Sequence, residues 1–321
     1  MDRRALIVGI DQYDSFPPLS GCVADADAML PVLARHEDGS KNYDCRIFTS
    51  VGVDRITRPF LRARWKELFG SFTGDAVFYF AGHGGPSGSG GFLVTQDGED
   101  DDLGLPMNEI VQLANDSPTR SVLIILDCCF SGAAGNSASL QTPGLYQATL
   151  REGVTILAAS RPTELAGEID GHGVFTDLVL GALRGGAADV RGHVSAAGIY
   201  GYVESAFGSW AQRPLYKSHA ARLDPVRLCL PKATDMLLRQ LPHFFSSADA
   251  DYRLDMSYEE TNGAAIAANV ETFKKFKTLQ LAGLLMPRSG SDLYWTAERS
   301  GSVVLTALGQ FYWRLVDEGL I

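Results

Sequence analysis

The chain lacks the features of membrane, disulfide-rich and zinc-binding proteins. No apolar run approaches the roughly 18 residues that a membrane-spanning helix requires. An apolar run follows the first arginines, but Asp11 ends it too early for a signal peptide. The 5 cysteines are odd in number and show neither a CxxC pair nor the Cys/His spacing of a zinc site. We therefore expect reduced thiols in a cytoplasmic protein, with no bound metal and no membrane partner.

Positive charge is also scarce. The chain has 28 Lys and Arg residues against 38 Asp and Glu residues, which gives a net charge of −10. This balance argues against a general nucleic-acid or anionic-membrane binder. Its 45% apolar and 21% charged residues are typical of a soluble globular protein, and 321 residues suggest two domains.

Reactive side chains follow two predicted strands. Residues 121–126 (SVLIIL) and 76–82 (AVFYFAG) are unbroken apolar runs, which indicate strands buried on both faces of a parallel sheet. The first run leads into Asp127, Cys128 and Cys129, and the second into His83. Open α/β sheets place their ligand sites at the carboxyl ends of the strands, so we expect an imidazole and a thiol at one edge.

A cysteine and a histidine together can form a nucleophilic catalyst. The histidine raises the thiolate fraction or accepts the proton during attack, and glycines after His83 leave backbone N–H groups accessible to an oxyanion. We predict Cys129 as the nucleophile, because strand alternation sends Cys128 to the opposite face, where it packs. The separation of 46 positions fits the caspase-type spacing of roughly 50 residues. His172, which precedes a predicted helix, is the rival imidazole.

Four segments carry a family resemblance: LSGCVADADAM, YFAGHGG, LDCCFSG and ILAASRPTELAGEIDGHGVFTDLVLGAL. In this order they resemble the caspase-like cysteine peptidases, in particular the metacaspase and bacterial caspase-homologue branch, over residues 4–220. The resemblance implies that Cys129 is the nucleophile, that His83 is the general acid and base, and that the backbone N–H groups of Gly84 and Cys129 form the oxyanion hole. Ala81 departs from the pattern, since those relatives often have serine two positions before the histidine.

The resemblance also implies a substrate preference. The metacaspase residue that matches Asp25 lines the pocket for the residue before the cut, and Asp127 is expected to supply a second acidic wall. With Ser160 they form the predicted substrate-binding set, and two carboxylates would select Arg or Lys by charge pairing. Two alternatives stay open: Asp25 merely stabilises the start of a helix, or Arg161 selects an acidic residue as arginines do in animal caspases.

Two loops bear on regulation. Residues 97–104 (DGEDDDLG) form an acidic run that we expect to be a solvated loop. Some metacaspases hold calcium with acidic residues in this general region, but the run lacks the spacing of a calcium loop, so we predict no cofactor and keep calcium as the alternative. Residues 133–150 contain no Lys or Arg. Apart from Arg151, a protease specific for basic residues has no site here, so we expect it to act as a single chain.

The overall pattern predicts an α/β, caspase-like fold with a mostly parallel sheet of about six strands sandwiched by helices, as a peptidase domain over residues 1–225. A loop is expected over residues 86–91. Residues 226–321 indicate a small α+β, winged-helix-like accessory domain, with strands at 293–295 and 302–305 around a turn at 299–301.

The resulting hypothesis is a cysteine endopeptidase that acts on protein substrates. Bacterial caspase-like proteins are often effectors of antiviral defence or regulated cell death, so the C-terminal domain is expected to bind an activating or inhibitory protein. Two alternatives are a catalytically silent adaptor that uses the caspase fold as a scaffold, and a DNA-binding regulator that acts through the C-terminal domain.

Overall fold

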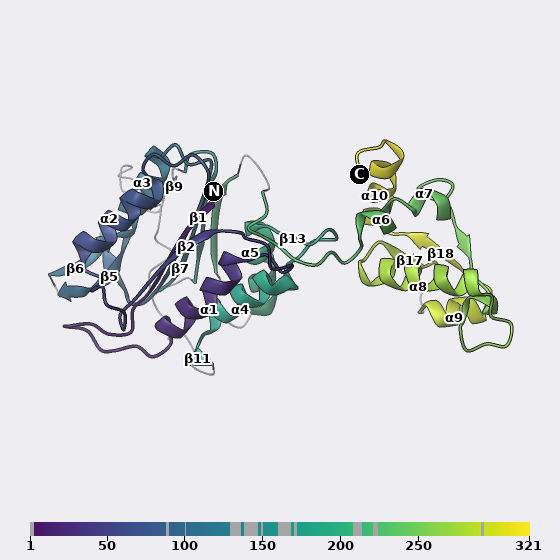
Figure 1. The fold of residues 1–321 in the computed structure, drawn as a ribbon, viewed down its shortest axis with the longest axis horizontal. Helices are drawn as coiled ribbons and strands as arrows, with labels where there is room; N and C mark the ends of the chain where they lie inside the picture. Colours follow the sequence, from purple (N-terminus) through teal and green to yellow (C-terminus); the bar gives the residue numbers. More distant parts are fainter. Residues whose placement is uncertain are drawn as a thin grey trace. The chain divides into compact units, whose positions relative to one another are not determined.

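The computed structural model divides the chain into two compact units (Figure 1). The first comprises Met1–Ala188 and His193–Cys229, and the second comprises Asp189–Gly192 and Leu230–Ile321. The structure describes residues 3–87, 90–99, 101–128, 136–137, 147–148, 150–159, 168–169, 172–207, 214–220, 224–289 and 292–321.

The first unit is built on a six-stranded sheet of order β14-β10-β7-β3-β1-β2. Its strands are β1 (Arg3–Gly9), β2 (Asp44–Thr49), β3 (Asp75–Ala81), β7 (Ser121–Asp127), β10 (Val154–Ala158) and β14 (Leu215–His219). Five are parallel, and β14 alone pairs antiparallel, with β10. Every residue of β3 is buried, which explains why this strand is an unbroken apolar run. The predicted six-stranded, mostly parallel sheet is confirmed.

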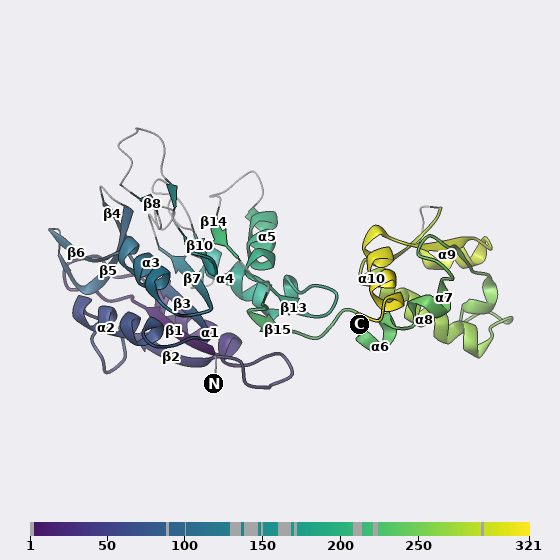
Figure 2. The same cartoon turned by 90° about the horizontal axis from the view of Figure 1, so that it is seen from above.

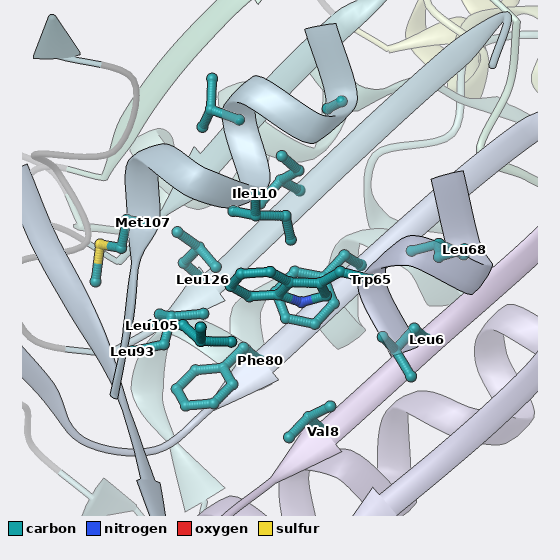
Figure 3. Packing of buried hydrophobic residues seen from close by; sticks show 14 of the residues in the cluster. Leu6, Val8, Trp65, Leu68, Phe80, Leu93, Leu105, Met107, Ile110 and Leu126 are labelled. Atoms are coloured by element: carbon teal, nitrogen blue, oxygen red, sulfur yellow. The ribbon is translucent and has the colours of Figure 1, made fainter. Parts of the chain in front are cut away.

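Helices cover both faces of this sheet (Figure 1). One layer contains α1 (Cys22–Ala34), α4 (Val174–Gly181), the π-helix η2 (Ala182–Gly186) and α5 (Ala196–Phe207), and the other contains α2 (Arg58–Phe69) and α3 (Met107–Asp116). Alternation along β1 divides the core, since Leu6 and Val8 face one cluster while Ala5 and Ile7 face the other. Figure 3 shows Trp65 of α2 among the apolar side chains of the first cluster. Its ring packs edge-on against that of Phe78, with ring centroids 5.7 Å apart.

A small antiparallel sheet follows β3, where a loop was expected. It consists of β4 (Gly84–Ser87), β5 (Gly90–Glu99) and β6 (Asp102–Pro106), and it packs beside α2 and α3 (Figure 2). The expectation of a loop is therefore wrong for residues 86–87 and 90–91, whereas residues 88–89 lie outside the described residues. The glycine-rich segment pairs with the start of the apolar strand β5, Gly84 opposite Leu93, and this cross-strand pairing outweighs the weak strand propensity of glycine.

Among the described residues of the first unit, six two-residue strands also form three antiparallel pairs. They are β8 (Asn136–Ser137) with β9 (Gln147–Ala148), β11 (Glu168–Ile169) with β12 (His172–Gly173), and β13 (His193–Val194) with β15 (Arg227–Leu228). The β12 strand leads directly into α4, which places Gly173 next to α1.

The second unit has its own core and a three-stranded antiparallel sheet of order β16-β18-β17. Its elements are α6 (Asp235–Leu238), α7 (Leu241–Phe244), β16 (Tyr252–Arg253), the 3₁₀ helix η3 (Met256–Tyr258), α8 (Ala267–Leu281), β17 (Leu285–Pro287), α9 (Leu293–Glu298), β18 (Ser302–Leu305) and α10 (Ala307–Asp317). In neither unit does the described chain contain a helix that is long and apolar enough to cross a bilayer.

The strand expected at residues 293–295 is wrong, because these residues begin helix α9. The Asp292 carboxylate accepts a hydrogen bond of 2.9 Å from the Trp295 N–H, which caps the helix and overrides the strand propensity of its aromatic residues. The strand expected at 302–305 is present as β18, but it pairs with β16 and β17 rather than forming a hairpin around residues 299–301.

Candidate active site

Two neighbouring strands end level with each other at the carboxyl edge of the sheet. Ala81, the last residue of β3, lies opposite Asp127, the last residue of β7, and the Gly82 N–H donates to the Asp127 carbonyl at 3.3 Å. His83 follows Ala81 by two positions, and Cys129 follows Asp127 by two positions in the sequence. Cys129 itself lies outside the described residues.

The His83 side chain is oriented by the loop that follows β1. Its Nε2 atom lies 2.8 Å from the carbonyl oxygen of Pro17. A carbonyl can only accept a hydrogen bond, so Nε2 carries the proton and Nδ1 of the neutral ring is the acceptor. The histidine backbone is held as well, because its carbonyl accepts from the Val94 N–H of β5 at 3.0 Å. The imidazole therefore has a defined tautomer, in which Nδ1 can take a proton from a thiol.

Two carboxylates converge at the same edge of the sheet. Asp25, buried in α1, accepts a hydrogen bond of 3.1 Å from the Gly173 N–H. A Cβ atom at residue 173 would lie 2.7 Å from Oδ2 of Asp127 and 3.3 Å from Oδ2 of Asp25. The Asp127 side chain, from strand β7, and the Asp25 side chain, from helix α1, therefore both approach Gly173. The structure thus brings together the two residues that the sequence analysis assigned to one pocket.

The Asp127 carboxylate is held in an environment that opposes its charge. Burial raises its pKa to about 6, and the nearby charge of Asp25 adds to the rise. The Thr176 hydroxyl donates a hydrogen bond of 2.6 Å to Asp127, and this bond lowers the pKa of the carboxyl group. Thr176 also bonds to the Tyr79 hydroxyl at 2.7 Å, which fixes the donor chain from Tyr79 through Thr176 to Asp127. A cation entering this region would relieve the repulsion between the two carboxylates.

Cys22 begins helix α1 near this acidic pair. Burial raises the pKa of its thiol strongly, and the charges of Asp11, Asp127 and Asp25 raise it further. The thiolate is the reactive form of cysteine, so Cys22 is a poor nucleophile in this position. Cys128 is buried in the apolar cluster on the other side of the sheet, in agreement with a packing role.

The remaining predicted site residues are only partly described. Gly84 is the first residue of β4, directly after His83. The backbone of His172 forms β12, opposite Ile169. Ser160 and Arg161, predicted for substrate selection, lie outside the described residues.

Within the acidic run, residues 97–99 belong to β5 and residues 102–104 to β6, where a solvated loop was expected, and residue 100 lies outside the described residues. Within it, Asp97 accepts from the Arg58 N–H at 3.1 Å and from the Thr95 hydroxyl at 2.6 Å, and Asp102 forms an ion pair with the Arg58 guanidinium. Across the part of the chain that the structure describes, no three His, Cys, Asp or Glu side chains gather as they would around a metal ion.

Three contributions to the site were missed in the sequence: the Pro17 carbonyl, the Tyr13 hydroxyl beside His83 and the Asp11 carboxylate. Asp11 accepts from the backbone N–H groups of Cys22 and Val23, at 2.8 and 3.3 Å, and so caps the helix that carries Asp25. Asp11 lies eleven positions before the helix that it caps, so the cap leaves no local signal in the sequence. The Pro17 contact uses a backbone carbonyl, which every residue type has, so its side chain gives no signal either.

Comparison with known proteins shows the family of the chain. A family model described as the caspase domain matches residues 2–223. The chain belongs to the caspase-domain family of cysteine peptidases. A structural-genomics protein from Geobacter sulfurreducens is similar to the chain in structure, with a TM-score of 0.53 and 16% identity over 71% of this chain and 100% of that one. Caspase-1 from Spodoptera frugiperda gives a TM-score of 0.48 at 16% identity, over 71% of this chain and 90% of that one. No curated protein matches the chain in sequence.

Proposed function

We propose that this caspase-domain chain is an active cysteine endopeptidase with Cys129 as nucleophile and His83 as general acid and base. The observation that carries the proposal is the hydrogen bond from His83 Nε2 to the Pro17 carbonyl, 2.8 Å long, which leaves Nδ1 as a proton acceptor at the strand edge. Cys129 follows the end of the neighbouring strand by the same two positions as His83 follows its own.

The reaction proceeds through an acyl-enzyme. His83 Nδ1 accepts the thiol proton of Cys129, and the thiolate attacks the peptide carbonyl carbon while backbone N–H groups of Gly84 and Cys129 bind the oxyanion. The C–N bond then breaks, and the imidazolium gives its proton to the leaving amine. Water activated by His83 hydrolyses the thioester and regenerates the thiol.

Cleavage after Arg or Lys is the specificity that the described residues favour. Asp25 and Asp127 both approach Gly173, so a guanidinium or ammonium group in this region would meet two carboxylates. Ser160 is proposed as a further contact of the same pocket. Selection of an acidic residue by Arg161 is the competing specificity.

Action as a single chain is supported by the environment of Arg151. Its backbone N–H donates to the Asn115 side chain at 3.0 Å, and its guanidinium donates to the carbonyls of Ala114 and Thr119 at 3.0 and 2.5 Å. Arg151 is the first basic residue after the segment 133–150, so it is where a protease specific for basic residues would cut its own chain. These hydrogen bonds hold Arg151 in the fold and disfavour its entry into another active site.

The second unit is proposed to bind a regulatory protein, and the whole chain to serve as an effector of defence or regulated cell death. The unit has an independent apolar core, and its helix α10 exposes Leu308 and Phe311 one turn apart. Exposed large apolar side chains of this kind suit a protein partner better than DNA.

The test is hydrolysis of matched fluorogenic peptides ending in Arg, Lys or Asp, with and without calcium. Wild-type protein should cleave the Arg and Lys peptides without calcium, and the Cys129→Ala and His83→Ala variants should not. Cleavage of the Asp peptide alone would move the specificity to Arg161. Hydrolysis that persists in Cys129→Ala would refute the mechanism, and calcium-dependent cleavage would refute the proposal that no cofactor is needed.

A further inference from the structure

Tyr13 contacts the backbone of the candidate catalytic histidine. Its hydroxyl accepts a hydrogen bond of 2.7 Å from the His83 N–H and donates one of 3.1 Å to the Ile10 carbonyl. His83 lies two positions after Ala81, the last residue of β3, so its N–H lies beyond the hydrogen-bond ladder of the sheet. The tyrosine thus supplies a partner for an N–H at the point where the chain leaves the sheet.

The ring of Tyr13 also packs against the imidazole. The two ring centroids are 4.8 Å apart with the planes inclined at 47°, and Phe16 packs edge-on against Tyr13 at 6.4 Å. Gly82 makes room for this arrangement, since a Cβ atom there would lie only 2.6 Å from the Tyr13 hydroxyl oxygen. One aromatic side chain therefore contacts both the backbone and the ring of His83.

The loop that carries Tyr13 is itself fixed at several points. The Asp14 N–H donates to the Gln96 carbonyl of β5 at 3.0 Å, and the Leu19 N–H donates to the Asp11 carbonyl at 2.8 Å. The same loop supplies the Pro17 carbonyl that orients His83 Nε2. Burial raises the pKa of Tyr13 well above its ordinary value, so its hydroxyl keeps the proton that it donates to Ile10.

We propose that Tyr13 is a positioning residue for catalysis: its hydroxyl and ring hold His83 at the place where Nδ1 meets the nucleophile. This inference rests on the proposed cysteine-peptidase function and extends it to a residue that acts through His83. Removing only the hydroxyl should let the histidine shift while the aromatic packing stays.

The test compares Tyr13→Phe with Tyr43→Phe. Tyr43 is a matched control, because it is buried and its hydroxyl accepts a hydrogen bond of 2.7 Å from Arg3 outside the proposed site. We expect Tyr13→Phe to lower kcat by about tenfold to hundredfold, the range that small misplacements of catalytic groups produce. KM should be unchanged, because the substrate pocket is not altered. Tyr43→Phe should keep the wild-type kcat, and both variants should remain folded by circular dichroism.

A second readout does not require turnover. The rate of Cys129 alkylation by iodoacetamide, followed by peptide mass spectrometry, depends on how well His83 takes up the thiol proton. Tyr13→Phe should slow this alkylation, whereas a merely loosened fold would speed it by exposing the thiol. An unchanged or faster rate, or a kcat equal to that of Tyr43→Phe, would overturn the role of Tyr13. Absence of wild-type hydrolysis would instead count against the peptidase function, and the alkylation rates would still decide the role of Tyr13.

Discussion

The two edges of the central sheet each contain a carboxylate at the end of a strand, but in opposite electrostatic settings. At the amino edge, Asp75 lies between two guanidinium groups, with Arg120 at 2.8 Å and Arg3 at 3.5 Å. At the carboxyl edge, Asp127 accepts from a neutral hydroxyl and lies near a second carboxylate, and its pKa is raised to about 6. The carboxylate at the amino edge is neutralised within the fold, whereas the carboxyl edge retains negative charge, which in the proposed function a basic substrate neutralises.

The largest expected effect is that of Asp127→Asn on catalysis. A hydrogen bond to a charged group contributes about 1.5–3 kcal/mol, so kcat/KM for an arginyl peptide should fall by about tenfold to hundredfold. Asp44→Asn, which removes an exposed carboxylate at the start of β2, is the control and should leave kcat/KM unchanged. Equal losses in both variants would mean that overall charge, rather than this pocket, selects the substrate.

The same substitution should stabilise the fold. The pKa of Asp127 is raised from 3.8 to about 6, so the folded state holds the proton more tightly than the unfolded state does. The favourable contribution of Asp127 to the free energy of unfolding is present below pH 3.8 and is lost as the pH rises through 6. At neutral pH this loss amounts to about 3 kcal/mol. Urea unfolding at pH 7 should therefore show Asp127→Asn to be more stable than wild type by about 1–3 kcal/mol. A clear loss of stability in Asp127→Asn would contradict the claim that the charge of Asp127 destabilises the fold at neutral pH.

Asp75→Asn should have the opposite effect at the amino edge. It leaves two guanidinium groups without their carboxylate, and we expect a loss of about 2 kcal/mol in the free energy of unfolding. This value is below that of a fully buried pair, because the Arg120 side chain is 46% exposed. Peptidase activity at 25 °C should not change. A loss of activity without a loss of stability would place Asp75 in the catalytic machinery.

The smallest expected effect is a pH dependence of substrate binding. Above pH 6 Asp127 is charged, and below it the carboxyl group takes up a proton. KM for an arginyl peptide should therefore rise as the pH falls through about 6, since part of the negative charge of the pocket is lost. In Asp127→Asn this rise should disappear. A KM that stays constant between pH 7 and 5 would show that Asp127 does not contact the substrate.

The sheet was predictable because its strands carry a strong signal. β3 and β7 are buried on both faces, so their apolar runs mark them, and the parallel arrangement brings His83 and Asp127 to one edge. The convergence of Asp25 with Asp127 was anticipated only through a family resemblance, since it depends on a helix start remote in sequence from β7.

The rest of the site depends on loop geometry that periodicity does not encode. Pro17 contributes a carbonyl and Tyr13 a hydroxyl from an irregular loop, so neither position stands out in the sequence. Local propensity was misleading in two places for different reasons. Gly84, Gly85, Gly90 and Gly91 form strands because β4 and β5 pair with each other. The aromatic residues after Asp292 form a helix because its carboxylate caps them.

The most direct measurement is covalent capture with an arginyl chloromethyl ketone, followed by peptide mapping. The account predicts one adduct, on Cys129, which forms faster than with the matched aspartyl reagent and more slowly in His83→Ala. Modification of Cys22 or Cys128 instead, or equal rates with the two reagents, would contradict a Cys129 nucleophile served by an acidic pocket.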